Sequence, residues 1–190
     1  TIGYDHLDTA YLKQAGIAWT NCPGCNASSV AQYVRSVLLL LAEEQGLNLS
    51  EATLGVVGCG HVGSLVCKVG SELGMRVLVC DPPLGNPGFV SLAEIEQQAD
   101  VITFHVPMER GGSYPTWHIA DDEFFGRLRR RPFIINSSRC CFFLLFKAFL
   151  FFFKSRYLDF SFNFLNSLLC IVDGLCISNI HLITISIKYK

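Results

Sequence analysis

Three glycines at short, regular spacing are the residues of this sequence best suited to hold a ligand. Gly58, Gly60 and Gly63 follow the apolar run 53–57 and lead directly into a helical pattern. The first glycine permits a tight exit from a strand, the second lets a pyrophosphate approach the backbone, and the third lets a helix lie close to the sheet. The free amides and positive dipole end of that helix then face the negative charge. The spacing therefore predicts a phosphate-binding turn.

An aspartate after the next strand supports this interpretation. The run 76–80 contains Val, Leu and Val, and Asp81 follows it, 18 residues beyond Gly63. An acid at roughly 20 residues is expected to hydrogen-bond the adenosine ribose of a dinucleotide. Pro82 and Pro83 come next, without an Arg or Lys to neutralise a 2′-phosphate, which favours NAD over NADP. The alternative hypothesis is a strand, turn and helix that bind no ligand.

Two further strands are predicted to end at the same edge of the sheet. Residues 101–106 bring His105 and Val106 to this edge, and residues 132–136 bring Ser137, Ser138 and Arg139. In open α/β folds, ligands bind outside the carboxyl ends of the strands. We interpret His105 as a residue that hydrogen-bonds the loop, with a proton carrier as the alternative. The whole pattern predicts an α/β fold with a Rossmann-type, doubly wound parallel sheet.

Helical periodicity predicts the elements between the strands. A long helix begins near Asn26 or Ser28, and its apolar face consists of Val30, Val34, Val37, Leu38 and Leu41. Residues 38–41 are apolar on every side, so we expect this helix to be buried between two units. A second amphipathic helix presents Leu65, Val66, Val69 and Leu73 and is closed by Gly74. Ser91 and Glu94 have the capping-box spacing that opens a third helix, which ends near Asp100.

The helix before the last of these strands carries acids at its start and arginines at its end. Residues 121–123 are acidic, and Arg127 and residues 129–131 are basic. This polarity complements the helix dipole, so we interpret the arginines as a solvated terminus rather than a nucleic-acid-binding patch. The net charge of −1 and the pI near 6.5 also predict no general attraction to nucleic acid or anionic lipid.

The first 25 residues are predicted to be the end of another structural unit. We expect a turn at Gly3, a helix over residues 8–15 stopped by Gly16, and a strand over residues 17–19. Cys22 and Cys25 have the spacing of a redox motif. The sequence around them is not thioredoxin-like, and no second C-x-x-C supplies zinc ligands, so a Pro-Gly turn leading into a helix is preferred.

Cysteine usage predicts the cellular compartment, and the start of the sequence predicts that residues are missing. Nine cysteines without regular spacing or a secretory signal indicate reduced thiols in a cytoplasmic protein. The sequence begins without Met inside what resembles a structural unit, so we expect preceding residues to be missing.

The last 51 residues differ in composition from the rest. Residues 140–190 hold ten of the 15 Phe, one Gly, no Pro and no Glu, which cannot supply the turns and caps of further βαβ units. We interpret this tail as the product of a frameshift or read-through. The apolar run 142–153 is too short to span a bilayer. Residues 183–189 alternate apolar and polar side chains, as an amphipathic strand does.

Several separate motifs resemble the D-2-hydroxyacid dehydrogenases over residues 1–139. The matching stretches are TIGYDHLD (1–8), PGCNA (23–27), GVVGCGHVG (55–63), CDPP (80–83), FHVP (104–107), PTWH (115–118) and NSSR (136–139). The resemblance implies that NAD accepts a hydride from the 2-hydroxyl carbon of a 2-hydroxy acid. The Asp-His, Asp-Pro-Pro and Pro-Thr-Trp-His stretches resemble the branch that oxidises 4-phospho-D-erythronate in vitamin B6 biosynthesis.

The resemblance also implies roles for individual residues. Thr1 would contact the substrate, His61 and Val62 the pyrophosphate, and Asp81 the ribose. Val106, Ser137, Ser138 and Arg139 would lie on the nicotinamide side, with Arg139 as the catalytic arginine. A guanidinium suits that role because its planar, charged fork can hold a carboxylate in two hydrogen bonds. No metal ion is expected, and the resemblance implies a homodimer.

Three departures from the family pattern affect these roles. Val106 and Tyr4 stand where the family usually has Thr. The Glu and His that remove the hydroxyl proton follow the arginine in the family, and neither occurs here in matching context; His181 is the weak alternative. We therefore keep three other hypotheses: a different D-2-hydroxyacid dehydrogenase, such as one acting on 3-phosphoglycerate; a non-catalytic NAD-binding fragment; and a membrane-tethered protein.

The sequence divides into four expected parts. Residues 1–26 are a remnant of the substrate domain, 27–52 a connecting helix, 53–139 the NAD-binding domain, and 140–190 the unmatched tail.

Overall fold

Four parallel strands form the centre of the protein, in a computed structural model that describes residues 4, 7–138 and 183–185. They are β1 (Thr53–Val57), β2 (Arg76–Cys80), β3 (Val101–Phe104) and β4 (Phe133–Asn136). A short fifth strand, β5 (Ile183–Ile185), pairs antiparallel with β4, and the order in the sheet is β2-β1-β3-β4-β5. The four parallel strands confirm the predicted sheet, and β5 falls within the stretch predicted to alternate as a strand.

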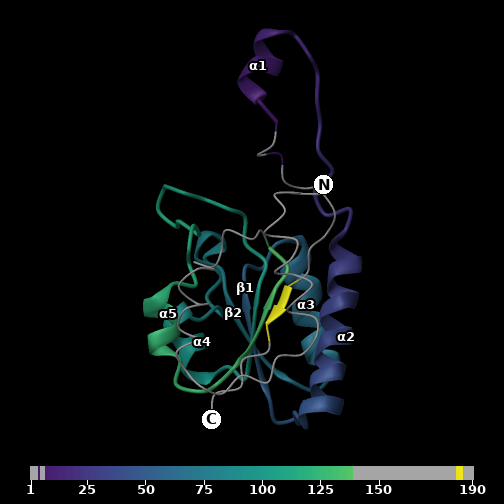
Figure 1. Ribbon diagram of the computed structural model, residues 1–190, viewed down its shortest axis with the longest axis vertical. Coiled ribbons are helices and arrows are strands. Elements are labelled where there is room, and N and C mark those ends of the chain that lie inside the picture. Colours follow the sequence, from purple (N-terminus) through teal and green to yellow (C-terminus); the bar gives the residue numbers. More distant parts are fainter. Residues whose placement is uncertain (1–3, 5–6, 139–182, 186–190) are drawn as a thin grey trace, which may run out of the picture.

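Helices cover both faces of this sheet (Figure 1). The helices α2 (Ala27–Gln45) and α3 (His61–Glu72) pack on one face, and α4 (Leu92–Gln98) and α5 (Asp122–Arg127) on the other. A short 3-10 helix, η1 (Pro82–Leu84), follows β2. The chain runs outward from β1 to β2 and then returns to place β3 on the other side of β1. The strand order therefore reverses between β1 and β3, as it does in a doubly wound fold.

The core consists of two apolar layers that the sheet separates. The layer under α2 and α3 includes seven residues with no exposed surface: Val34, Leu38, Leu54, Val56, Val66, Val101 and Ile135. The layer under α4 and α5 includes Ile95, Ile102, Phe104, Phe124 and Ile134. Every residue of β3 is buried, which is expected of an inner parallel strand covered on both faces.

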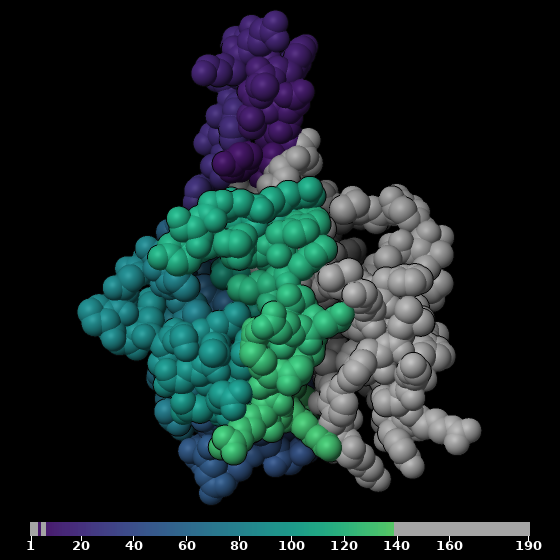
Figure 2. Space-filling model, turned by 90° about the vertical axis from the view of Figure 1, so that its left-hand side faces the viewer, coloured from purple at the N-terminus to yellow at the C-terminus, as the bar shows by residue number. Residues whose placement is uncertain are grey.

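The N-terminal segment contains the predicted helix but not the predicted strand. Helix α1 (Thr9–Gln14) begins after Asp8, whose carboxylate accepts a hydrogen bond from the Tyr11 amide at 2.9 Å. It buries none of its side chains and stands away from the sheet in Figure 1, and the purple N-terminal segment projects above the teal and green residues in Figure 2. The strand expected over residues 17–19 is wrong: Ile17 and Trp19 are exposed and unpaired by any described strand. An apolar run forms a strand only where a neighbouring strand can pair with it.

Helix α2 departs from its predicted environment on one side. Its predicted apolar face is buried, as the sequence indicated. Leu39 and Leu40 are nevertheless 48% and 50% exposed, so the described residues cover α2 on the sheet side alone. The expectation that this helix lies between two units is wrong for the described part of the chain. Asn26 is the N-cap residue, but its side chain makes no capping hydrogen bond.

The arginines at the end of α5 and just after it are exposed, as the sequence predicted, but two of them also form ion pairs. Arg127 donates two hydrogen bonds, at 2.7 and 2.9 Å, to the carboxylate of Glu96, which is 1% exposed. Arg130 donates to both carboxylate oxygens of Asp100 at 2.8 and 3.0 Å. These two arginines therefore tie the end of α5 to α4 and to the start of β3.

Candidate functional site

The turn after β1 has a backbone that only glycine can supply. Gly58 has a φ of +91°, and its amide donates to the Cys80 carbonyl of β2 at 2.8 Å. A Cβ at this position would lie 2.7 Å from the carbonyl oxygen of His105 and equally close to a methyl of Val106. The turn is thus wedged between the ends of β2 and β3, at the point where the strand order reverses.

The start of α3 approaches this turn closely and leaves space on its outer side. A Cβ at Gly63 would lie 1.9 Å from the Gly58 carbonyl oxygen, so the helix can approach only because residue 63 is glycine. At Gly60, the N-cap residue, a Cβ would have no atom within 4 Å. The first intrahelical hydrogen bond runs from the Ser64 amide to the Gly60 carbonyl, so the amides of residues 61–63 precede the hydrogen-bonded ladder. The open side of Gly60 therefore faces amides that can bind an anion.

Asp81 lies at the end of β2, where the ribose-binding acid was predicted. One carboxylate oxygen accepts from the Cys59 amide at 2.7 Å, and the other accepts from the Leu84 amide at 3.3 Å. The carboxylate is half-buried and offers about four acceptor positions, so two remain for hydroxyl groups of a ligand. Asp81 thus holds the glycine-rich loop in place while keeping acceptors for a ribose.

His105 links the ends of three strands through its backbone and ring. Its amide donates to the Val57 carbonyl at 2.7 Å. The ring nitrogens lie 2.9 Å from the Thr103 hydroxyl and 2.6 Å from the Ser137 hydroxyl. Removal from water lowers the pKa of His105 to about 4, so the ring is neutral at neutral pH. These contacts confirm the interpretation of His105 as a residue that hydrogen-bonds the loop.

Ser137 and Ser138 stand at the end of β4, beside the end of β3. Both hydroxyls donate to the Phe104 carbonyl, at 3.3 and 3.1 Å, and the Ser138 amide donates to the side chain of Asn136. The strand ends therefore bring Gly58, Asp81, His105, Val106 and Ser137 to one edge of the sheet, as predicted. Thr1, Arg139 and His181 lie outside the described residues, as do the predictions for residues 140–182.

A contact that no sequence signal indicated joins the Cys22–Cys25 turn to this edge. A Cβ at Gly24 would lie 3.1 Å from Cγ of His61, the first residue of α3. Gly24 and His61 are 37 positions apart, and only the folded chain brings them together.

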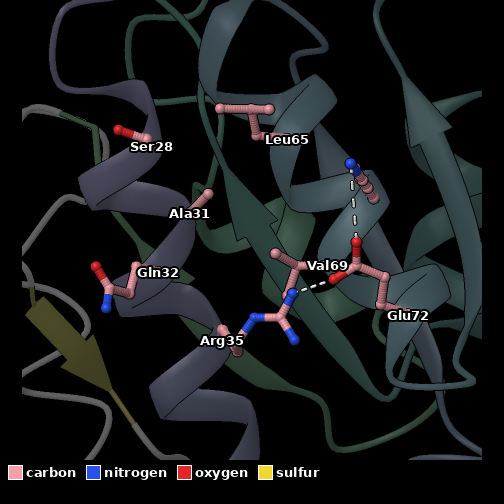
Figure 3. A pocket seen from close by; sticks show the side chains of 8 residues that line it. Ser28, Ala31, Gln32, Arg35, Leu65, Val69 and Glu72 are labelled. Carbon is pink, nitrogen blue, oxygen red and sulfur yellow. Dashed lines mark hydrogen bonds and ion pairs between the residues drawn. The ribbon is translucent and has the colours of Figure 1, made fainter.

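A shallow hollow of about 250 Å³ lies between α2 and α3 and contains none of the predicted cofactor residues (Figure 3). An ion pair between Arg35 and Glu72 crosses it, and Lys68 lies 3.9 Å from the same carboxylate. Leu65 lines the hollow and is exposed, which corrects its predicted place in the apolar face of α3. These contacts join the two helices on their outer side.

The described residues contain no group of three or more His, Cys, Asp or Glu side chains placed to hold a metal ion. In the same residues, no helix is long and apolar enough to cross a membrane.

The fold and the glycine turn define the class of protein. A parallel sheet with a strand-order reversal, an open helix N-terminus at that point and an acid at the end of the second strand make up a dinucleotide-binding α/β domain. The residues present fit such a ligand, since the space beside Gly60 and the remaining acceptors of Asp81 suit a diphosphate and a ribose.

Comparison with known proteins gives the family. Residues 28–142 match the model of the D-isomer specific 2-hydroxyacid dehydrogenase, NAD binding domain, so the chain belongs to this family and NAD is the cofactor of its domain. The chain is similar to proteins named erythronate-4-phosphate dehydrogenase: 51% identical over 143 residues to that of Bacteroides thetaiotaomicron, and 49% over 142 residues to that of Pseudomonas syringae pv. syringae. The matches cover 73% of this chain but 41% and 37% of those relatives.

Solved structures support the same family. The D-lactate dehydrogenase of Aquifex aeolicus, complexed with NAD and lactic acid, has a TM-score of 0.66 and 26% identity, with 92% of this chain and 60% of that chain covered. The NAD⁺-bound 3-phosphoglycerate dehydrogenase of Entamoeba histolytica has a TM-score of 0.67 and 25% identity, with 80% and 51% covered.

Proposed function

We propose that this chain is part of an NAD-dependent dehydrogenase that oxidises 4-phospho-D-erythronate to 2-oxo-3-hydroxy-4-phosphobutanoate. The observation that carries the proposal is the identity of about half over 143 residues to relatives bearing the corresponding name. The chain spans about two fifths of the length of those relatives, so the activity belongs to the proposal. The place of the reaction in vitamin B6 biosynthesis and a cytoplasmic location are parts of the same proposal.

The residues of the described edge would hold the cofactor. The amides of His61, Val62 and Gly63 would donate to the diphosphate, and Asp81 would accept from the adenosine ribose. Val106, Ser137 and Ser138 would lie on the nicotinamide side. NAD, when bound, supplies the acceptor for the hydride that leaves C2 of the substrate. His105 would keep Ser137 in place through its hydrogen bond rather than carry a proton, because a pKa of about 4 makes its ring a weak proton acceptor at neutral pH.

The substrate side of the proposal rests on residues outside the described part. Thr1 would contact the substrate, and Arg139 would bind its carboxylate and stabilise charge on the forming carbonyl oxygen. Removal of the hydroxyl proton needs a base, and the family's Glu and His, which follow the arginine, do not occur in this sequence in matching context. We propose residues 1–26 as a substrate-domain remnant, 27–52 as a connection, 53–139 as the NAD-binding domain and 140–190 as an unmatched tail. The proposed assembly is a homodimer.

A turnover comparison tests this function. The full chain is mixed with NAD and with either 4-phospho-D-erythronate or 3-phosphoglycerate, and NADH formation is followed by absorbance. Faster turnover of the four-carbon acid supports the proposal. A preference for 3-phosphoglycerate would overturn it in favour of the second candidate, the activity named for the structurally similar Entamoeba histolytica enzyme. NADH binding without turnover of either acid would instead favour a non-catalytic NAD-binding fragment.

A further inference from the structure

Two cysteines that the proposed function does not use stand at the ends of one tight turn. Cys22 and Cys25 are free thiols, and both are exposed. The Cys25 amide donates to the Cys22 carbonyl at 3.4 Å, and Gly24 has a φ of +79°. A four-residue turn of this kind keeps its first and last Cα atoms within about 7 Å. Disulfides span Cα separations of about 4.4–6.8 Å, so the pair can close with a small adjustment of the turn.

The same turn touches the candidate dinucleotide site. The imidazole of His61 lies beside Gly24, since a Cβ at Gly24 would be 3.1 Å from its Cγ and 3.3 Å from its Nδ1. His61 is the first residue of α3, whose amides face the open side of Gly60. On its other side the turn continues into α2, because the Ala27 amide donates to the Gly24 carbonyl at 3.0 Å. A change in the turn is therefore transmitted to the start of α3.

We propose that Cys22 and Cys25 form a reversible disulfide, and that its formation weakens dinucleotide binding at the start of α3. The oxidant is a small-molecule disulfide such as oxidised glutathione. One cysteine thiolate attacks it and releases one glutathione thiolate; the other cysteine then attacks the mixed disulfide and releases the second. The two cysteines lose two electrons, and their two protons end on the two glutathione thiols. The effect on binding rests on the proposed dinucleotide site, whereas the disulfide itself does not.

The other described cysteines are poorer candidates for this chemistry. Cys67 and Cys59 are hydrogen-bonding neighbours, but burial, with the nearby Cys59, raises the pKa of Cys67 to about 12. Cys80 is buried, and this burial, with the charges of Asp81 and Glu96, raises its pKa to about 11. Since the thiolate is the attacking species, these two groups react slowly at neutral pH. Among the described cysteines, Cys22 and Cys25 are the exposed ones.

Closure of the disulfide is expected to disturb His61. The hydrogen bond across the turn is long, so drawing the two Cα atoms together tightens the turn and shifts Gly24. A Cβ at Gly24 would lie 3.1 Å from Cγ of His61, so the ring leaves little room for the turn to shift towards it. The ring must therefore move, and the first turn of α3 moves with it. We expect NADH to bind at least threefold more weakly to the oxidised chain.

The test equilibrates the full chain in buffers of reduced and oxidised glutathione. Peptide mapping by mass spectrometry measures the Cys22–Cys25 disulfide, and NADH fluorescence measures affinity in each buffer. The disulfide and the loss of affinity should appear together, should reverse with excess reduced glutathione, and should vanish in Cys22→Ser. Cys67→Ser, on α3, is the matched control and should respond like the parent chain.

Three results would overturn parts of the inference. Absence of the Cys22–Cys25 disulfide in every buffer would refute the modification site. Formation of the disulfide with unchanged NADH affinity would refute the coupling to α3. If the reduced, folded chain bound no NADH, the proposed dinucleotide site would fail and the coupling with it, while the peptide map would still decide whether the dithiol closes.

Discussion

Replacing each of two glycines by alanine should separate ligand binding from folding. At Gly60, a Cβ has no atom within 4 Å and the φ of −75° is open to alanine, so Gly60→Ala should lower the free energy of unfolding by less than about 1 kcal/mol. The added methyl occupies the space proposed for the diphosphate. NADH affinity should therefore fall at least tenfold, which corresponds to about 1.4 kcal/mol.

Gly63→Ala should lower folding stability clearly, whereas Gly60→Ala should affect mainly NADH binding. A Cβ at Gly63 would lie 1.9 Å from the Gly58 carbonyl oxygen, whereas real Cβ contacts are essentially never under 3.0 Å. The start of α3 or the turn must therefore move by more than 1 Å. Forced overpacking of this kind costs about 1–3 kcal/mol. Gly63→Ala should lower the denaturant midpoint clearly, in addition to weakening NADH binding.

Urea unfolding and NADH fluorescence titration of the purified chains measure these two effects. Gly126→Ala is the matched control, because this glycine lies in α5 with open space around its Cα and takes no part in the site. It should leave NADH affinity unchanged and raise stability by up to about 1 kcal/mol. If Gly60→Ala bound NADH as tightly as the parent chain, the proposed position of the diphosphate would be wrong.

Three further substitutions test other parts of the structure. Asp81→Asn should weaken NADH binding about tenfold and reduce the preference for NADH over NADPH, because it removes the carboxylate that accepts hydrogen bonds from the ribose. Parallel titrations with NADH and NADPH measure both effects. An unchanged preference would show that Asp81 does not contact the ribose. Arg127→Ala should lower the free energy of unfolding, measured in urea, by about 3 kcal/mol, since it leaves the buried Glu96 carboxylate without its cation. A decrease below about 1 kcal/mol would show that the ion pair is dispensable for stability. The pKa of His105 is lowered to about 4 in the folded chain, below its ordinary 6.5, so its stabilising contribution is complete above pH 6.5 and is lost as the pH falls towards 4. Stability should decline by up to about 3 kcal/mol over that window, and His105→Gln should flatten the profile.

The sequence predicted the strands and the glycine turn well because local rules determine them. The bounds of β1 and β2 follow from apolar runs that end at Gly58 and Asp81, and the spacing of the glycines reflects steric limits that hold wherever this turn occurs. The hydrogen-bonding role of His105 was also anticipated, since a histidine at a strand end finds partners on the neighbouring strands.

The incorrect predictions concern partners that lie far away in the chain. Residues 17–19 have the composition of a strand, but strand formation depends on a neighbour that periodicity cannot reveal. The exposure of Leu39 and Leu40 depends in the same way on what lies opposite α2. Glu96, the partner of Arg127, is 31 positions away, and the contact between Gly24 and His61 spans 37. Such contacts are set by tertiary packing and become visible only in the folded chain.

Amides at the start of α3 and the carboxylate of Asp81 hold the dinucleotide in the site that we propose. Calorimetric titration of the folded, reduced chain with NADH measures this. We predict saturable heat with one site per chain, and a marked loss of affinity in Gly60→Ala. A folded chain that gives no binding heat and no change in NADH fluorescence would contradict the account.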